Sequence, residues 1–405
     1  MNDPDPVVDH LAHVVPLVVP AEPLPPVATV VVVGGGIMGV SIAFHLAEAG
    51  VAEVLVLERN TLGSGSSAKP LGGVRATFSD TRNIVLGQRS LVAFEQFEQR
   101  FGTDIGLRQV GYLFLCRTGD QVAAVEQSVR QQNDLGCPSR MVDPAEAQRL
   151  NPFLDPGCLL AASYSPRDGY AEPARVVAGY RAAAERLGAR FAEHTEVVEV
   201  TTGADGRHRV TTQCGSVTTP TVVIAAGAWS TRLGAMLGVH LPIEAIRRQI
   251  GFTPQQHHPY PTVPFTLDLS TTLYFHNHRH GLLLGISNTD EEPGLCREFS
   301  YGWTRAFDAA AEIVAPSLAH RRLAGGWAGL YENSPDHNAM IGRARNAPGV
   351  LYATGFSGHG FLQGPAVGEI VRDLYLGREP FLDPAPMSAD RFTGDGNLLR
   401  EVHII

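Results

Sequence analysis

The 405-residue chain has no long apolar run, few cysteines and no surplus of basic residues. None of its apolar runs approaches the roughly 18 residues that a membrane-spanning helix needs, so we expect no membrane segment. The 41 acidic residues outnumber the 32 basic ones and give a formal net charge of −9. This balance argues against a nucleic-acid-binding protein, because such proteins usually carry a basic surplus on one face.

The few cysteines and the N-terminal residues indicate the cellular compartment of the protein. Five cysteines are scattered along the chain without a Cys-x-x-Cys pair, a pattern typical of reduced intracellular thiols. No basic segment precedes the first apolar residues and no twin arginine stands near the N-terminus, so we expect no export signal. These observations predict a cytoplasmic protein.

The chain does contain enough apolar residues, 44%, to build a sizeable core. Its length suggests two or three structural units. Residues 1–26 are rich in proline interspersed with valine and alanine, which predicts an extended arm that packs little against the rest.

A β-α-β unit near the N-terminus is the clearest ordered element. Residues 28–33 form an apolar run of the kind found in strands that are buried on both faces of a parallel sheet. A glycine-rich turn and a helical pattern over 40–49 follow, and a second strand over 53–57 ends at Glu58. This arrangement predicts a nucleotide-binding fold.

The glycines of the first turn have the spacing Gly34-x-Gly36-x-x-Gly39, and Glu58 lies nineteen residues after Gly39. The first glycine permits a tight turn, and the second lets the backbone approach a pyrophosphate at the helix N-terminus. Glu58 is placed to accept hydrogen bonds from ribose hydroxyls. Because an acid disfavours a 2′-phosphate, Glu58 favours FAD or NAD over NADP.

A second glycine loop near the C-terminus favours FAD. Residues 355–364 follow a predicted strand over 350–354 and precede a helix that we expect from about Pro365 to Leu376. A nicotinamide dehydrogenase has no use for such a loop. A reduced flavin is anionic at N1 and C2=O, and backbone N–H groups with a helix N-terminus stabilise that charge.

The remaining patterns predict two kinds of unit. Helical periodicity over 81–101, 143–150 and 176–187 and strands near 190–200 and 210–225 extend the nucleotide-binding part, whereas 239–335 alternates as in an antiparallel sheet. The fold class is therefore mixed α/β (α+β), with a Rossmann-type FAD-binding domain in discontinuous segments and a substrate domain with a mainly antiparallel sheet. The expected division is 1–26 for the arm, 27–107, 172–238 and 336–385 for the FAD-binding domain, 108–171 and 239–335 for the substrate domain, and 386–405 for a tail.

Five motifs, in order along the chain, resemble one protein family. They are Val33-Gly-Gly-Gly-Ile-Met-Gly39, Gly63-Ser-Gly-Ser-Ser-Ala68 with Gly72-Gly-Val-Arg75, Ile224-Ala-Ala-Gly-Ala-Trp229, Trp327-Ala-Gly-Leu-Tyr331 with Ser334-Pro-Asp336, and Gly355-Phe-Ser-Gly-His-Gly-Phe361. Together they resemble the D-amino-acid-oxidase-type flavoproteins, in the branch of the sarcosine oxidases and their β-subunit-like relatives.

The resemblance implies a set of contacts to FAD along about residues 28–385. The implied cofactor-binding residues are Gly34, Gly36, Ile37, Met38, Gly39, Glu58, Arg59, Ser66, Ser67, Ala68, Val197, Ala226, Gly227, Trp229, Gly355, Gly358, His359, Gly360, Phe361 and Leu362. It also implies that Arg75 anchors a substrate carboxylate, for which a planar two-donor cation is well suited. Tyr274 and Tyr331 match aromatic positions that line the substrate pocket.

Several histidines are further candidates for the active site. His276, His278 and His280 alternate along one predicted strand, and either a metal site or a role in tuning the charge of the pocket fits this spacing. We favour the second role, with no metal, because no acids or cysteines stand at matching positions. A neutral His276 or His278 is able to help deprotonate an incoming ammonium, and a cationic His359 would favour the reduced flavin.

Three positions depart from the covalent sarcosine oxidases. Gly329 stands where those enzymes carry the cysteine that bonds the flavin, so we expect FAD to be held noncovalently. Leu283 lies nearest to the position of a lysine that promotes reaction with oxygen, and Leu362 replaces a second lysine. These losses leave both O2 and another electron carrier open as the acceptor.

The predicted activity is oxidation of the C–N bond of an amino acid or secondary amine, with hydride transfer to flavin N5 and hydrolysis of the resulting imine. Alternatives are a nicotinamide-dependent dehydrogenase, an FAD-dependent amine dehydrogenase subunit of a larger complex, and a noncatalytic FAD-binding scaffold. The expected partners are a small-molecule amino acid or amine and O2 or an electron carrier, without nucleic acid or membrane. A homo-oligomer or a partner subunit also remains open.

Overall fold

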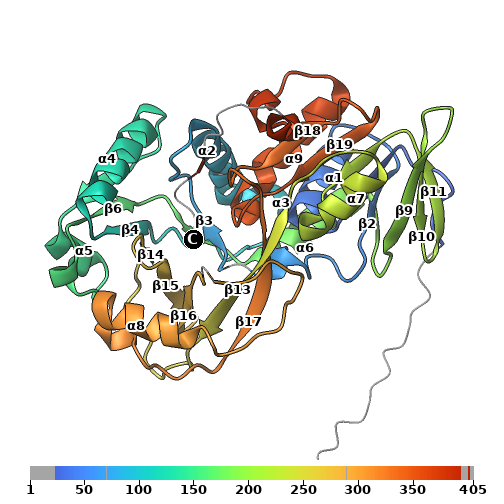
Figure 1. Ribbon diagram of the computed structural model, residues 1–405. Helices are drawn as coiled ribbons and strands as arrows, with labels where there is room; N and C mark the ends of the chain where they lie inside the picture. The colour runs from blue at the N-terminus through green and yellow to red at the C-terminus, as the bar shows by residue number, and fades with distance from the viewer. Residues whose placement is uncertain (1–22, 70, 289, 394–399, 402–405) are drawn as a thin grey trace, which may run out of the picture.

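The computed structural model describes residues 23–69, 71–288, 290–393 and 400–401. The chain forms two parts that lie side by side, each built around one large sheet (Figure 1). Residues 1–22 of the expected N-terminal arm lie outside the described residues. In the part of the chain that the structure describes, no helix is both long and apolar enough to cross a membrane.

The first sheet is assembled from six strands that are far apart in the sequence. Their order is β18-β19-β12-β1-β2-β8, and all neighbours are parallel except β18 and β19. Every residue of β1 and β2 is buried, which confirms the predicted β-α-β unit. The bounds are Val30–Val33 (β1), Val54–Leu57 (β2), Arg190–Ala192 (β8), Val222–Ile224 (β12), Met340–Arg343 (β18) and Val350–Thr354 (β19).

The two faces of this sheet are covered by different layers. Val30 and Val32 of β1 pack into a core with the helices, whereas Val31 and Val33 point to the opposite core, because side chains alternate along a strand. The helical layer contains α1 (Ile37–Glu48), α2 (Thr81–Glu95), α3 (Phe97–Phe101), α6 (Pro173–Arg186) and α9 (Gly360–Leu376). The opposite layer contains a small antiparallel sheet of β9 (Val197–Thr202), β10 (His208–Thr212) and β11 (Gly215–Thr219), with α7 (Ser230–Met236).

Helix α9 begins five residues earlier than expected, so Pro365 lies inside it rather than at its start. A Cβ atom at Gly364 would lie 2.6 Å from Ile37, and one at Gly368 would lie 2.3 Å from Ser41. These glycines therefore let α9 pack closely against α1. The tertiary contact outweighs the local preference of proline for the first turn of a helix.

The second sheet has eight strands in the order β17-β13-β16-β15-β14-β4-β6-β5. All its neighbours are antiparallel except β4 and β14, which confirms the mainly antiparallel sheet. The bounds are Tyr112–Cys116 (β4), Arg140–Val142 (β5), Ala161–Ser165 (β6), Glu244–Phe252 (β13), Phe265–Asp268 (β14), Leu273–His278 (β15), Gly281–Ile286 (β16) and Gly325–Asn333 (β17).

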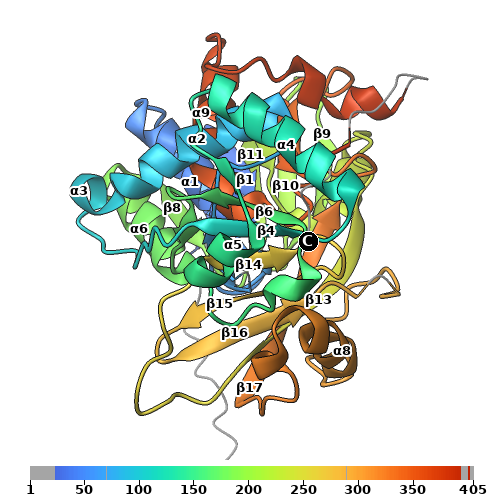
Figure 2. The same ribbon diagram turned by 90° about the vertical axis from the view of Figure 1, so that its left-hand side faces the viewer.

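One face of the eight-stranded sheet carries helices, and the other carries an aromatic cluster. Helices α8 (Thr304–Val314) and α5 (Pro144–Leu150) pack on one face (Figure 2). Helix α4 (Gly119–Asp134) packs against Cys116 on the other face, beside β4 and β6. The aromatic cluster includes Tyr112, Phe114, Phe265 and Tyr274. It forms one wall of the candidate site.

A short ribbon and the described end of the chain complete the framework of the site. Strand β3 (Gly73–Val74) pairs with β7 (Gly169–Tyr170) immediately before Arg75. The buried Glu401 accepts hydrogen bonds from the backbone N–H groups of Ser79 and Asp80, each at 3.1 Å, and from the Asn83 side chain at 3.0 Å. This carboxylate therefore fixes the two residues that lead into α2, whose N-cap is Asp80.

Candidate functional site

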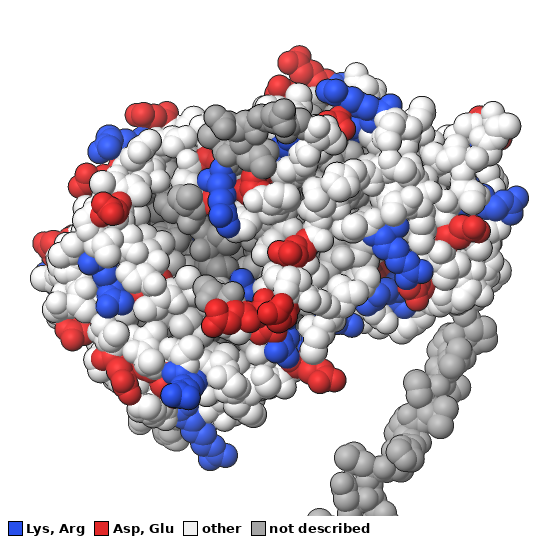
Figure 3. Space-filling view, viewed as in Figure 1, with Lys and Arg blue, Asp and Glu red and all other residues white. Residues whose placement is uncertain are grey.

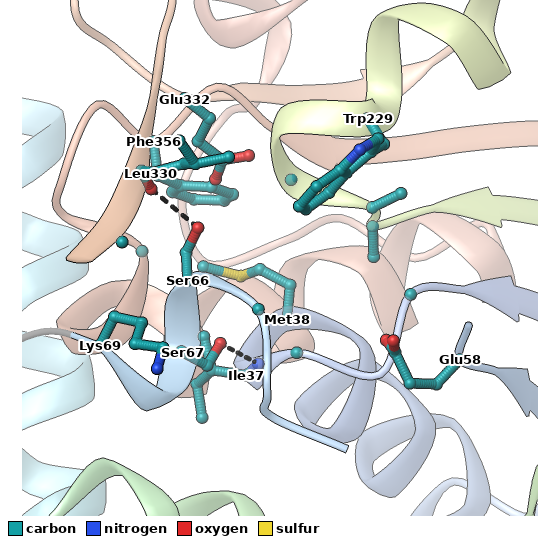
Figure 4. A pocket seen from close by; sticks show the side chains of 18 of the residues that line it. Ile37, Met38, Glu58, Ser66, Ser67, Lys69, Trp229, Leu330, Glu332 and Phe356 are labelled. Atoms are coloured by element: carbon teal, nitrogen blue, oxygen red, sulfur yellow. Dashed lines mark hydrogen bonds between the residues drawn. The ribbon is translucent and has the colours of Figure 1, made fainter. Parts of the chain in front are cut away.

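A cavity of about 180 Å³ extends from the C-terminal ends of β1 and β2 to β17. Figure 4 shows side chains converging on it from the first turn, from the loop around Ser66 and from Trp229. Seventeen of the predicted residues line it, namely Gly34, Gly36, Ile37, Met38, Glu58, Arg59, Ser66, Ser67, Val197, Ala226, Gly227, Trp229, Tyr274, Tyr331, Gly358, Gly360 and Phe361.

The turn between β1 and α1 leaves no room for side chains at two of its glycines. Gly34 has φ +110°, and a Cβ atom there would lie 2.3 Å from the Ala225 carbonyl oxygen. A Cβ atom at Gly39 would lie 1.8 Å from the Gly34 oxygen. The first turn of α1 contains no acid and has no side-chain cap at Gly36, so its positive end is open to an anion such as a pyrophosphate.

Glu58 lies at the opposite side of this turn, at the end of β2. One carboxylate oxygen accepts a hydrogen bond from the Gly35 N–H and the other from the Asn60 N–H, both at 2.8 Å. Arg59 stacks over the Trp229 ring with its guanidinium carbon 3.8 Å from the centroid. This end of the cavity fits an adenosine, since it offers a fixed hydrogen-bond acceptor for ribose and a flat surface beside it.

At the other end of the cavity, β17 and the second glycine loop meet. Gly358 has φ +95°, and a Cβ atom there would lie 2.5 Å from the Tyr331 ring. Ser66 donates a hydrogen bond to the Leu330 carbonyl at 2.7 Å and so joins the Ser66–Ala68 turn to β17. The N-terminus of α9 also begins here, at Gly360. The two ends and the central turn together fit a dinucleotide carrying a flat ring system.

A second, smaller cavity of about 50 Å³ adjoins the first and shares four lining residues with it, Leu71, Tyr331, Gly358 and Phe361. Its other lining residues are Gly73, Arg75, Tyr112, Phe265, Ser357, His359 and Leu362. The Tyr112 and Phe265 rings are stacked with their centroids 4.3 Å apart. The cavity therefore combines apolar and aromatic walls with one guanidinium.

Arg75 is buried in this cavity, with only 4% of its surface exposed. Its guanidinium lies 3.9 Å from the centroid of the Phe78 ring, donates to the Thr77 carbonyl and lies 3.4 Å from Nε2 of His359. Burial lowers the pKa of Arg75, and the carboxylates of Glu401 and Asp168 oppose this shift. A guanidinium held in a buried, partly aromatic cavity is suited to binding a carboxylate.

Asp168 supports the Arg75 loop from behind. Its carboxylate accepts hydrogen bonds from the Ala76 N–H at 3.0 Å and from the Thr77 hydroxyl at 2.6 Å. Burial raises the pKa of Asp168 to about 6, although both hydrogen bonds and Arg75 favour the ionised form. The loop that contains Arg75 is therefore hydrogen-bonded to an acid whose pKa is raised toward neutral pH.

We expect the stability of the protein to fall between about pH 4 and pH 6 because of Asp168. The unfolded carboxyl ionises near pH 4, whereas the native one stays protonated until about pH 6, so the native state binds more protons in this range and loses stability as the pH rises. Urea unfolding of wild type and Asp168→Asn at pH 4, 5 and 6 measures this difference. Wild-type stability relative to the variant should drop by about 2–3 kcal/mol across the range; a constant difference would contradict it.

Some predicted residues lie outside both cavities. Gly39 lies behind the turn, Gly355 packs against Met340, and Ala68 is exposed. His359 and Leu362 line the second cavity rather than the first. Most of the predicted cofactor set therefore lines the larger cavity, and these positions lie at its margins.

The histidines of β15 also lie outside both cavities. His276 is buried, with Nδ1 2.7 Å from the Asn277 oxygen and Nε2 3.1 Å from the Leu71 oxygen. Burial lowers the pKa of His276 to about 4 and also lowers that of the half-buried His278. Among the described residues, no group of three or more His, Cys, Asp or Glu side chains is placed to hold a metal ion.

Several lining residues were not singled out by the sequence. They include Lys69, Leu71, Arg232, Arg248, Ile250, Arg297 and Glu332 in the larger cavity, and Gly73, Tyr112, Phe265 and Ser357 in the smaller one. Glu332 could have been predicted as a site residue, because it is an acid directly after the motif tyrosine, Tyr331. The others come from the antiparallel sheet and from loops, where no local pattern marks a binding residue.

Surface charge adds no second candidate site on the visible face. Acidic and basic side chains are interspersed there without a large patch of one sign (Figure 3). The cavity between the two parts is thus the candidate site from which the chemistry is inferred. A cavity shaped for a dinucleotide, with a buried guanidinium next to it, is typical of a flavoprotein oxidoreductase.

Comparisons with known proteins agree with this class. The family described as "DAO: FAD dependent oxidoreductase" matches residues 29–374, so the chain belongs to this family of FAD-dependent oxidoreductases. Glycine oxidase of Geobacillus kaustophilus is 29% identical over 374 residues, covering 90% of this chain and 97% of that protein. The structure of L-proline dehydrogenase from P. horikoshii is 32% identical, with a TM-score of 0.85, and the match covers 91% of this chain and 99% of that one.

Other relatives are longer than this chain. Human mitochondrial dimethylglycine dehydrogenase is 28% identical over 386 residues, which cover 90% of this chain but 44% of that protein. The chain thus spans less than half of this relative. FAD is the cofactor of the family, and the cavity has the acceptor, the glycine turn and the open helix N-terminus that FAD requires.

Proposed function

We propose that the protein oxidises the C–N bond of a small secondary amino acid, one whose nitrogen carries a ring or an N-alkyl group. The observation that carries this proposal is the buried Arg75 in a small aromatic cavity next to the FAD cavity. The cavity provides a cation for one carboxylate and apolar walls for the rest of the molecule. Relatives named L-proline dehydrogenase and dimethylglycine dehydrogenase support a substituted amine.

The residues of the chain supply binding, orientation and exclusion of water. Arg75 binds the substrate carboxylate, and the stacked Tyr112 and Phe265 hold the carbon skeleton on one side. Tyr331 borders both cavities and so lies where the substrate and the cofactor meet. When bound, FAD accepts the hydride from the carbon next to nitrogen. The amine must be neutral to react, because its lone pair drives loss of the hydride from the adjacent carbon.

We further propose that the segments 27–107, 172–238 and 336–385 act as the FAD-binding domain and that 108–171 and 239–335 bind the substrate. A cytoplasmic location is also our proposal, supported by five cysteines that all remain free. For the electron acceptor, the leucines at 283 and 362 support a carrier rather than O2. The length of the longer relatives supports a search for a partner subunit.

Anaerobic spectra of the purified protein test the proposal. We expect a yellow protein whose flavin bands bleach with L-proline or sarcosine and bleach more slowly with glycine, a primary amine of the same size class. Admission of air and addition of an artificial electron acceptor then distinguish the two acceptors. Bleaching by primary amino acids alone would contradict the substrate class, and a yellow protein that no amine bleaches would favour a scaffold.

A further inference from the structure

An acid in the FAD cavity has no part in the binding described above. Glu332 is one residue after Tyr331 in β17 and lines the larger cavity. Because side chains alternate along a strand, Tyr331 and Glu332 point in different directions. Tyr331 packs on Gly358, whereas an oxygen of Glu332 lies 3.2 Å from the position of a Cβ atom on Gly227.

The partners of Glu332 are neutral. The Thr354 hydroxyl lies 3.3 Å from Oε2, and the backbone N–H groups of Gly355 and Phe356 favour the ionised form. Within the described residues no arginine, lysine or histidine forms an ion pair with this carboxylate. Burial raises the pKa of Glu332 to about 7 despite these donors. A carboxyl group without a cation in such a place is costly unless further hydrogen-bond donors reach it.

The position of Glu332 along the cavity identifies which donors these are. Glu58 and Val197 mark the adenosine end, and Tyr331 and Gly358 mark the ring end. Glu332 directly follows Tyr331 of the ring end in β17, and its carboxylate approaches Gly227 on the side of Trp229 (Figure 4). The pyrophosphate is excluded as its partner because two anions repel each other. The remaining segment of FAD between the two ends is the ribityl chain, whose hydroxyl groups are hydrogen-bond donors.

We propose that Glu332 is a binding residue for FAD whose carboxylate accepts hydrogen bonds from the ribityl hydroxyl groups. The carboxylate then has neutral donors on both sides, from Thr354 on the protein and from the polyol on the cofactor. This role rests on FAD binding and not on the identity of the substrate. It adds a charged contact from β17, a strand of the eight-stranded sheet, to the residues that hold the cofactor.

The test measures FAD affinity of the apoprotein by flavin fluorescence, with FAD and with FAD analogues that lack single ribityl hydroxyls. For wild type, the analogue that lacks the contacted hydroxyl should bind about tenfold more weakly than FAD. Glu332→Ala should bind FAD about tenfold more weakly and should no longer distinguish FAD from that analogue. Glu332→Gln retains one acceptor oxygen and should keep part of the preference for FAD over that analogue. If the alanine variant folds poorly, the glutamine variant replaces it in the test.

Glu196→Gln is the matched control. Glu196 also lines the cavity but pairs with Arg232 at 3.6 Å on the adenosine side, so this variant should discriminate between the analogues as wild type does. The proposal is overturned if Glu332→Ala binds FAD as tightly as wild type, or if wild type and both Glu332 variants discriminate equally. The test adds no amine, so its outcome does not depend on whether the proposed substrate class is correct.

Discussion

Replacing Arg75 with lysine should lower kcat/KM for the amino-acid substrate by about 100-fold or more, mainly through a higher KM. The substitution keeps the charge but removes the planar pair of donors that matches a carboxylate. A lost pair of charge-assisted hydrogen bonds in a dry cavity is worth about 3 kcal/mol, which corresponds to a factor of this size. Arg75→Met, which also removes the charge, should have a larger effect.

The measurement is the rate of anaerobic flavin reduction as a function of substrate concentration. Arg167→Lys is the matched control, because Arg167 lies one residue before Asp168 but pairs with Glu95 at 2.8 Å on the surface. This control should leave the kinetics unchanged. FAD content and unfolding midpoint of each variant separate an anchor role from damage to the loop, since Arg75 also donates to the Thr77 carbonyl. An unaltered KM in Arg75→Lys would contradict the assignment.

Replacing Gly39 with alanine should give a protein that loses FAD on purification and is less stable. The new Cβ atom would lie 1.8 Å from the Gly34 oxygen, so the turn between β1 and α1 must open. Overpacking of this kind costs about 1–3 kcal/mol of stability. The larger effect falls on FAD, because the turn and the first N–H groups of α1 approach the pyrophosphate together.

Absorbance of the purified variant and FAD titration of its apoprotein measure this effect, and we expect an affinity at least about 100-fold lower. Gly119→Ala is the control. Gly119 is the first residue of α4, and a Cβ atom there meets nothing within 4 Å, so the protein should stay yellow and equally stable. A Gly39→Ala variant that retains FAD through gel filtration would show that the turn tolerates a side chain.

Local patterns carried much of the prediction. The β1 run, the three glycines and Glu58 were assigned from spacing alone, because a buried parallel strand followed by a tight turn requires these residue types wherever it occurs. The end of a helix was less well predicted. The expected helix over 81–101 is divided after Glu95, and α9 begins at Gly360 rather than near Pro365. Packing against α1, not the local sequence, decides where α9 starts.

The site residues on the eight-stranded sheet are the ones that local sequence patterns could not predict. Tyr112 and Phe265 stand more than 150 residues apart and become stacked only because β4 and β14 pair in parallel. Glu332 and Gly227 approach each other across the two parts of the molecule. Strand pairing at such separations depends on the whole chain, so no window of neighbouring residues contains it.

Residue types and their spacing are enough to indicate the cofactor class and the position of its binding turn, because backbone approach to a pyrophosphate demands glycines at set intervals. Three features follow from packing alone: Arg75 is buried beside an aromatic pair, His276 lies outside both cavities, and Glu332 lines the cofactor cavity next to Gly227. The physical reason is that burial, and with it the chemistry of a charged or titratable side chain, is a property of the packed chain rather than of its neighbours in sequence.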